Sequence, residues 1–215
     1  MNEDPKMSSH HEDDHPHTPR PDESDRLTYY QTMEIAVREL LIEKGILTAD
    51  DVRRQVEDMD GRNAGLGARM VARAWVDPAY KQRMLVDGNA AAEEVGLDRG
   101  IFKLVVVENT PQVHNVVVCT LCSCYPRWLL GLPPDWYKSR NYRSRVVREP
   151  RAVLREFGLD LPDAVTVRVH DSNADMRYLV MPMRPSGTEA LGEEQLAALV
   201  TRDSMVGVTV PVAAP

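Results

Sequence analysis

The chain has 215 residues, of which 43% are hydrophobic, and this is enough apolar material to build a sizeable core. Its formal net charge of -7 gives no general electrostatic reason to bind nucleic acid, so nucleic acid is excluded as an expected partner. No apolar run approaches the ~20 residues that cross a bilayer, and the polar, acidic N-terminus is unlike a signal peptide, which predicts a cytoplasmic protein without a membrane partner.

The segment 1–26 is predicted to be a disordered, acidic, histidine-rich tail. Residues 1–25 contain eight acidic residues, two basic residues and four prolines, with almost no apolar side chains. The histidines His10, His11, His15 and His17 could bind a divalent metal transiently, although a solvated tail without a role is the simpler interpretation. We therefore assign the tail no catalytic role.

Residues 27–100 are predicted to form a helical arm that wraps around a partner subunit. Apolar residues recur at helical spacing from Leu27 to Lys44, and Thr48 with Asp51 marks the start of a second helix. Such helices have wide apolar faces and no predicted strand to cover them. Helices of this kind often pack against another subunit.

Glycines interrupt the helical pattern between residues 61 and 67, and they predict a hinge between helices. A phosphate-binding loop is the weaker interpretation, because such a loop needs a Lys-Ser/Thr pair and a preceding strand. A third helix is predicted over 68–75 and a fourth over 77–85, where Asp77-Pro78 has the residue types of a helix start.

Residues 101–215 are predicted to form a second region of mixed α and β structure. Short, β-branched, apolar segments predict strands at 102–107, 113–118, 164–169, 177–181 and 205–210. Helices are expected to begin near Pro134 and Glu149 and to cover 193–203. The predicted fold class is therefore α+β, with a helical N-terminal arm followed by a mixed, layered α/β domain.

All three cysteines, Cys119, Cys122 and Cys124, fall within six consecutive positions after the predicted strand that ends at Val118. In a cytosolic protein such a cluster points to metal or redox chemistry rather than to a disulfide framework. Three thiolates are soft metal ligands, but no fourth cysteine is present to complete a four-thiolate zinc site. The backbone nitrogens of Ser123 and Cys124 would lie near an ion held by the sulfurs, and they are candidates for the missing ligands.

The type of metal depends on whether those amide nitrogens bind. An amide nitrogen is a strong ligand only after it loses its proton, which requires a polarising cation such as trivalent cobalt or iron rather than zinc. Three sulfurs and two nitrogens would leave one position open for water or substrate. Three alternatives stay open: a zinc site completed by His114, a redox-active pair of Cys119 and Cys122, and buried inert thiols.

A longer motif surrounds the cysteines. It runs from Val118 to Pro126, continues through 130–134 and 142–151, and has further matches as far as 201–208. These residues closely resemble the alpha subunit of nitrile hydratases of the cobalt type, and the similarity covers roughly residues 30 to 210. The gamma subunit of thiocyanate hydrolase belongs to the same family and is similar in the same places, including Tyr125-Pro126-Arg127.

The resemblance implies a metal-binding catalytic domain at 101–215 with a low-spin cobalt(III) ion, and iron(III) is the less favoured alternative. Thr120 and Tyr125 are similar to the cobalt branch of the family. Two cysteines would be oxidised, with Cys122 as the sulfinate and Cys124 as the sulfenate. The implied ligands are the three sulfurs and two backbone amides of Cys119, Cys122, Ser123 and Cys124.

The resemblance also implies the reaction. A nitrile would be hydrated to the amide, and Cys122, Ser123 and Cys124 are the implied catalytic residues. The implied partners are a beta subunit or split beta-like subunits and a small-molecule nitrile, and an activator protein could insert the metal. The alternative within the family is the metal-binding subunit of thiocyanate hydrolase, which forms carbonyl sulfide and ammonia. The alternative from another class is a non-catalytic zinc-binding interaction module.

The sequence departs from many nitrile hydratases directly after Tyr-Pro, where it has Arg127-Trp128 in place of tryptophan and proline. This change concerns the substrate side, and it leaves room for thiocyanate or a large nitrile. Two sets of side chains near the loop keep open roles. Arg127, Arg143 and Arg145 are candidates for support of the loop or for contacts with a partner subunit, and ordinary surface ion pairs are the alternative. Trp128, Trp136 and Tyr137 either line a substrate pocket or belong to the core or a subunit interface.

Overall fold

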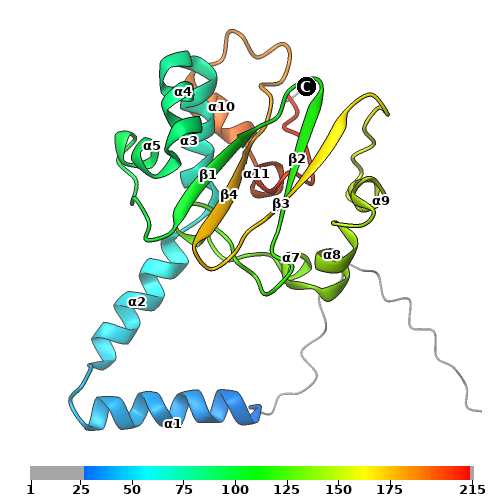
Figure 1. Cartoon of the computed structure of the whole chain (residues 1–215). Helices are drawn as coiled ribbons and strands as arrows, with labels where there is room; N and C mark the ends of the chain where they lie inside the picture. The colour runs from blue at the N-terminus through cyan, green and yellow to red at the C-terminus, as the bar shows by residue number, and fades with distance from the viewer. Residues whose placement is uncertain (1–26, 214–215) are drawn as a thin grey trace, which may run out of the picture.

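A computed structural model of the chain describes residues 27–213, and the tail predicted at 1–26 lies outside the described residues. Eleven helices and four strands make up the described chain, and the strands form two small parallel sheets (Figure 1). This confirms the predicted α+β class. None of the described helices is both long enough and apolar enough to cross a membrane.

The first two helices extend away from the rest of the molecule (Figure 1). They are α1 (Tyr29–Glu43) and α2 (Ala49–Gly61), and within the described chain neither helix has a buried residue. The start of α2 is as predicted, because the Thr48 side chain accepts a hydrogen bond from Asp51 N and the Asp51 side chain bonds back to Thr48 N.

The next three helices pack into the body of the molecule instead. They are α3 (Ala64–Val76), α4 (Pro78–Val86) and α5 (Gly88–Glu94). The predicted break between helices is present but shorter than 61–67, because α2 ends at Gly61, Asn63 caps α3, and α3 runs through Gly65 and Gly67. A Cβ at Gly67 would lie 2.8 Å from Leu130 Cδ2, so this glycine serves close packing of α3 rather than a break.

The four strands pair in parallel. Strand β1 (Lys103–Glu108) pairs with β4 (Met176–Met181), and β2 (Val113–Val118) pairs with β3 (Thr166–Asp171). Four of the five predicted strands are therefore confirmed, with bounds that differ by at most two residues. In the β2/β3 register Val118 lies opposite Asp171, so the residues that follow β2 emerge beside the end of β3.

Four short helices follow β2. They are α6 (Arg127–Leu130), α7 (Asp135–Lys138), α8 (Arg140–Arg145) and α9 (Pro150–Glu156). The helix starts near Pro134 and Glu149 are confirmed, whereas the sequence pattern did not indicate α6 or α8. The last three of these helices are joined by an aromatic cluster, in which the Trp136 ring lies 4.9 Å from the Tyr142 ring and 4.8 Å from the Phe157 ring.

The C-terminal part departs most from expectation. Two helices, α10 (Glu193–Leu199) and α11 (Arg202–Val206), replace the predicted helix at 193–203, and the predicted strand at 205–210 is wrong. Thr201 caps α11 by accepting a hydrogen bond from Ser204 N, and Gly207 ends the helix with a φ of 89°. Val206 and Val208 are buried in the core without belonging to a sheet, whereas Val210 is exposed.

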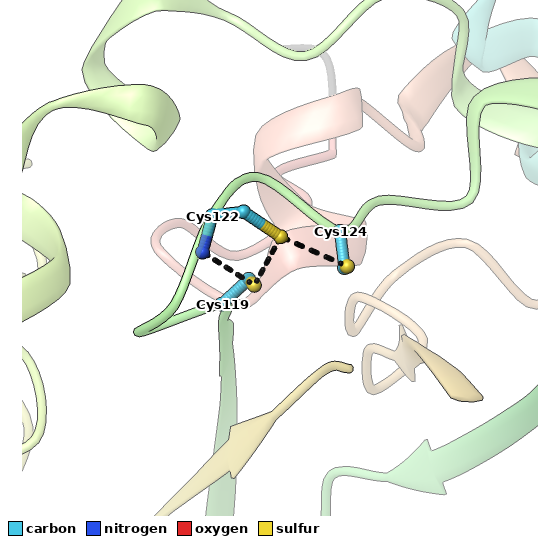
Figure 2. A group of neighbouring side chains, drawn as sticks. All are labelled: Cys119, Cys122 and Cys124. Carbon is cyan, nitrogen blue, oxygen red and sulfur yellow. Dashed lines mark hydrogen bonds between the residues drawn. The ribbon is translucent and has the colours of Figure 1, made fainter. Parts of the chain in front are cut away.

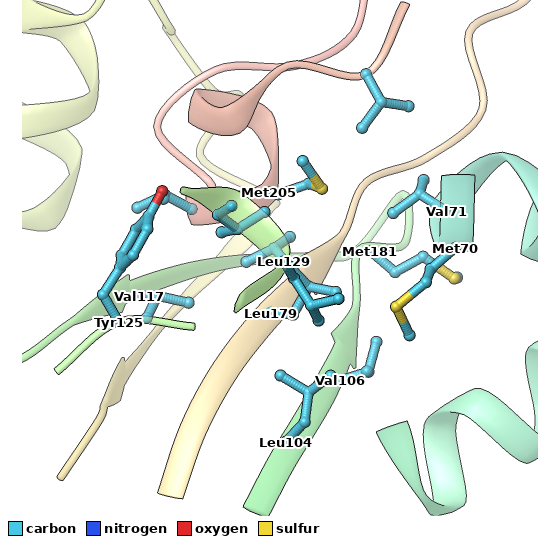
Figure 3. Packing of buried hydrophobic residues seen from close by; sticks show 14 of the residues in the cluster. Met70, Val71, Leu104, Val106, Val117, Tyr125, Leu129, Leu179, Met181 and Met205 are labelled. Carbon is cyan, nitrogen blue, oxygen red and sulfur yellow. The ribbon is translucent and has the colours of Figure 1, made fainter. Parts of the chain in front are cut away.

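The core lies between β1, β4 and the helices that cover them (Figure 3). Leu104 and Val106 of β1, Leu179 of β4, Met70 of α3 and Met205 of α11 belong to one buried cluster. The cluster therefore connects α3, in the N-terminal half of the chain, with α11 near its C-terminus. The core also includes Val116, Val117 and Val118 of β2, so the strand that leads to the cysteines is fixed by packing.

Candidate metal centre

The three cysteines converge in one tight loop directly after β2 (Figure 2). The Sγ atoms of Cys119 and Cys122 are 3.4 Å apart, those of Cys122 and Cys124 are 3.2 Å apart, and all three lie within 4.8 Å of one another. Cys119 is buried, Cys124 is half-buried and Cys122 is exposed. The predicted convergence of the three sulfurs on one point is present.

A carboxylate at the end of β3 holds the first half of the loop. Asp171 Oδ1 accepts a hydrogen bond from Thr120 N at 2.9 Å, and Asp171 Oδ2 accepts one from Thr120 Oγ1 at 2.5 Å. The next residue along, Ser172, donates its N–H to Val118 O at 2.7 Å. Because β2 and β3 are parallel, both strands deliver these groups to the same edge of the sheet.

Side chains of α7 and α8 hold the second half of the loop through its carbonyl oxygens. Arg143 Nη1 donates to Cys122 O at 3.0 Å, and the Tyr137 hydroxyl donates to Cys124 O at 2.8 Å. Below the loop, the Tyr142 hydroxyl donates to Val117 O at 2.7 Å. With Asp171, these contacts give the loop a defined shape through groups outside the loop itself.

Hydrogen bonds between the thiols make their acidities unequal. Those from Cys124 and Cys119 stabilise the Cys122 thiolate and lower the pKa of Cys122. Burial, followed by its hydrogen bond with Cys122, raises the pKa of Cys124 to about 12. Of Cys122 and Cys124, Cys122 therefore loses its proton first, and it is also the more exposed of the two thiols.

The loop opens into a pocket of about 580 Å³. Cys122, Ser123 and Cys124 form part of its lining, together with the aromatic rings of Phe102 and Trp128. The charged side chains that line the same pocket are Arg62, Asp98, Arg127 and Arg177. A small molecule in this pocket would lie next to the sulfurs between apolar walls, within reach of three guanidinium groups.

The three arginines singled out from sequence have three different environments. Arg145 is in an ordinary ion-pair cluster with Glu149 and Glu156, each at 2.5 Å. Arg127 is exposed and lines the pocket. Arg143 donates a hydrogen bond to the cysteine loop, so it is the arginine of the three that supports the loop.

The three aromatic residues also divide. Trp128 lines the pocket, as the pocket interpretation expected. Trp136 and Tyr137 belong to the core instead, where their rings are 5.9 Å apart, and neither lines this pocket. Tyr137 still reaches the site through its hydroxyl, which supports the loop from behind.

His114, the residue considered as a fourth zinc ligand, lies away from the sulfurs. Its Nε2 is 2.7 Å from Gly207 O, which can only accept, and its Nδ1 is 3.3 Å from Asn109 Nδ2. Burial lowers the pKa of His114 and favours the neutral ring that this pattern needs. Both ring nitrogens are thus engaged, and the potential metal-binding group found in the described part of the chain consists of the three cysteines alone.

The redox alternative has no support in the local structure either. A thioredoxin-like pair needs its first cysteine at the start of a helix, where the helix N-terminus stabilises the thiolate. Here residues 119–126 are irregular, and α6 begins only at Arg127. The inert-thiol alternative fits poorly because Cys122 is exposed.

Two residues of the site had no individual signal in the sequence. For Asp171 the reason is that its contact with Thr120 depends on the parallel pairing of β2 with β3. Arg177 is buried with its Cζ 4.1 Å from the centre of the Phe102 ring, and its Nε has no hydrogen-bond partner within the described chain. A buried guanidinium in a pocket wall is visible only in three dimensions.

Comparison with known proteins agrees with this geometry. A family model described as nitrile hydratase, alpha chain, matches residues 28–209. The alpha subunit of the low-molecular-weight cobalt-containing nitrile hydratase of Rhodococcus rhodochrous is 51% identical over 179 residues, which is 82% of this chain and 86% of that relative. The thiocyanate hydrolase gamma subunit of Thiobacillus thioparus is 47% identical over 194 residues, or 85% of this chain and 80% of that relative.

Solved structures agree as well. A recombinant thiocyanate hydrolase with partially modified cobalt centres superposes with a TM-score of 0.80 at 44% sequence identity, and the match covers 88% of this chain and 95% of that one. These findings confirm the resemblance inferred from the cysteine motif, and the matched relatives are subunits of enzymes. The chain therefore belongs to the nitrile hydratase alpha-chain family.

Proposed function

We propose that this chain is the metal-bearing alpha subunit of a cobalt nitrile hydratase, which adds one water to a nitrile and releases the amide. The observation that carries the proposal is the convergence of three cysteine sulfurs within 4.8 Å at the wall of a pocket of about 580 Å³. The 51% identity with a cobalt-containing nitrile hydratase subunit supports the choice of metal and reaction.

The residues present fit a trivalent cobalt ion. Three sulfurs form a soft donor set, and the group includes no carboxylate or imidazole that would favour another metal. The proposed ligands are the sulfurs of Cys119, Cys122 and Cys124 and the backbone nitrogens of Ser123 and Cys124. Cobalt is preferred to iron because two of the compared relatives are a cobalt-containing hydratase and a hydrolase with cobalt centres.

The same environment supports the proposed oxidation pattern, with Cys122 as the sulfinate and Cys124 as the sulfenate. Oxidation starts from an accessible thiolate, and Cys122 is both exposed and lowered in pKa. Cys119 is fully buried at the end of β2, which protects its sulfur from oxidants. The number of oxygens therefore follows exposure, with two on exposed Cys122, one on half-buried Cys124 and none on buried Cys119.

A nitrile carbon is a poor electrophile. The trivalent ion, when bound, would act as a Lewis acid and withdraw electron density from the triple bond. The remaining work belongs to side chains of this chain. Cys124, as a sulfenate, supplies the attacking oxygen or activates a water for attack on the carbon, and the Ser123 hydroxyl donates a hydrogen bond within the site. Phe102 and Trp128 give the pocket apolar walls that orient the substrate and exclude bulk water.

We infer that the site is completed by a beta subunit or split beta-like subunits. Oxidised cysteines carry negative charge that needs further donors, and arginines of a partner could supply them. The helical arm at the N-terminus is the proposed docking element, because Tyr30, Met33, Val37 and Leu40 of α1 are exposed on a helix that nothing in the described chain covers.

Thiocyanate is the second candidate substrate, and the charge of the pocket favours it. Arg62, Arg127 and Arg177 line the pocket against a single carboxylate, Asp98, so the pocket suits an anion. The carbon of thiocyanate resembles that of a nitrile, and its products would be carbonyl sulfide and ammonia. The 47% identity with a thiocyanate hydrolase subunit is consistent with this alternative.

The two reactions are separated by an assay of the assembled complex, with the neighbouring subunits co-produced, against thiocyanate and a panel of aliphatic, aromatic and nucleoside nitriles. We expect amide formation from at least one nitrile at a higher kcat/KM than thiocyanate turnover. Arg127→Gln is expected to weaken thiocyanate turnover more than nitrile turnover, because only the anion loses a charge partner. Faster turnover of thiocyanate than of every nitrile would reverse the order of the two proposals.

A further inference from the structure

We infer that Arg143 stabilises the peptide group between Cys122 and Ser123 in its metal-bound form and thereby sets how firmly the site retains cobalt. The inference rests on the proposed function, because it concerns the Ser123 nitrogen as a metal ligand. Arg143 acts here as a positioning and charge-balancing residue and touches neither substrate nor metal.

The geometry places the guanidinium on the correct oxygen. Arg143 Nη1 donates to Cys122 O at 3.0 Å. That oxygen and the Ser123 nitrogen belong to the same planar peptide group, in which electrons are shared across the O–C–N unit. A donor at the oxygen is therefore coupled electronically to the nitrogen.

This coupling matters when the nitrogen binds a trivalent ion. The amide proton passes to solvent as the nitrogen–metal bond forms, and the peptide group then carries negative charge that resonance places partly on the Cys122 oxygen. The hydrogen bond from the Arg143 guanidinium then joins a cation to a negatively charged group instead of to a neutral carbonyl, and it becomes stronger. The guanidinium therefore favours the bound form over the free form.

The charge of Arg143 is available for this purpose. No carboxylate of the described residues forms an ion pair with Arg143, and its Nε is buried without a hydrogen-bond partner among them. Two residues along the same helix, Arg145 is neutralised by Glu149 and Glu156. Arg143 is therefore an unpaired, partly desolvated cation next to the cysteine loop. Its positive charge balances the negative charge that the loop carries when the metal is bound.

The position of Arg143 is also rigid. Its helix, α8, is capped by Ser139, whose side chain accepts a hydrogen bond from Tyr142 N. Tyr142 is fully buried, and its hydroxyl is bonded to Val117 O at the base of the loop. The guanidinium and the loop are thus held by the same framework, so the contact does not depend on a flexible surface side chain.

The loop provides its own matched control. Tyr137 donates to Cys124 O at 2.8 Å, but the nitrogen of that peptide group belongs to Tyr125, which is not a proposed ligand. Removal of the Tyr137 hydroxyl therefore takes away one loop hydrogen bond of similar length without affecting a metal-binding peptide group. Purely structural support would make the two contacts equivalent.

The test compares Arg143→Met, Arg143→Lys and Tyr137→Phe in the assembled complex. We expect cobalt loss to an excess of chelator to be about tenfold faster in Arg143→Met, as for loss of a charge-assisted hydrogen bond. Arg143→Lys should recover part of that loss, and Tyr137→Phe should release cobalt at close to the wild-type rate. Zinc affinity of complexes produced without cobalt, in which the cysteines are unmodified thiols, should be equal in all four proteins, because zinc binds the thiolates without deprotonating an amide.

Equal cobalt release from Arg143→Met and Tyr137→Phe, or a parallel fall in zinc affinity, would overturn the inference and leave Arg143 as a structural support. Cobalt retention in the wild-type complex separates this result from a failure of the proposed function. A wild-type complex that holds no cobalt would overturn both.

Discussion

Replacement of Cys124 with serine is expected to lower turnover of the assembled complex by at least about 100-fold without unfolding the chain. A serine hydroxyl cannot form the sulfenate that supplies or activates the attacking oxygen, and it is a poor ligand for a soft metal site. The fold should persist, because Cys124 is half-buried in a loop whose shape is held by Asp171, Tyr137 and Arg143. Steady-state kinetics and near-UV circular dichroism measure the two effects.

Two variants of the same loop control this experiment. Ser123→Ala keeps the backbone nitrogen, so we expect it to keep its cobalt while turnover falls. Cys119→Ser removes the buried sulfur at the end of β2 and should cost the metal itself. Full turnover by Cys124→Ser would contradict the sulfenate role, whatever its metal content.

Gly207→Ala is expected to lower the free energy of unfolding by more than about 3 kcal/mol. Gly207 has a φ of 89°, where an L side chain is strained, and a Cβ there would overlap the carbonyl oxygen of Asn115 in β2. The glycine oxygen also accepts the hydrogen bond from buried His114. The substitution would therefore push α11 away from the strand that leads to the cysteines, and denaturant unfolding measures the loss.

Gly187→Ala provides the matched control. Gly187 has a similar φ of 79°, but a Cβ there would meet nothing within 4 Å. We expect a loss of about 1 kcal/mol from backbone strain alone. Equal effects of the two substitutions would mean that the close approach of Gly207 to β2 contributes nothing.

Periodicity and capping residues were sufficient to predict the helices that stand alone. The start of α2 at Thr48 follows from a local capping pattern, and local patterns need no tertiary information. Tertiary packing decided the failures. Gly67 lies inside α3, where Leu130 leaves no room for a side chain, and the buried residues Met205, Val206 and Val208 pack in the core without forming a strand.

The candidate site shows the same division. The convergence of the three sulfurs was predictable because their spacing leaves few other arrangements, and the family motif supplied the implied ligands. The supporting groups were not predictable individually. Arg143 and Arg145 are two residues apart and chemically identical, yet one bonds to the cysteine loop and the other to two glutamates. Asp171 reaches Thr120 across 51 residues only because β2 and β3 run parallel.

The central claim, a cobalt centre in an oxidised cysteine loop, is tested most directly by metal analysis combined with intact mass of the chain purified with its partners. The expected result is about one cobalt per chain and a mass gain of three oxygen atoms, two on Cys122 and one on Cys124. Peptide mapping should place all three oxygens within the loop and none on Cys119. Zinc bound to unmodified thiols would contradict the account and favour a non-catalytic interaction module.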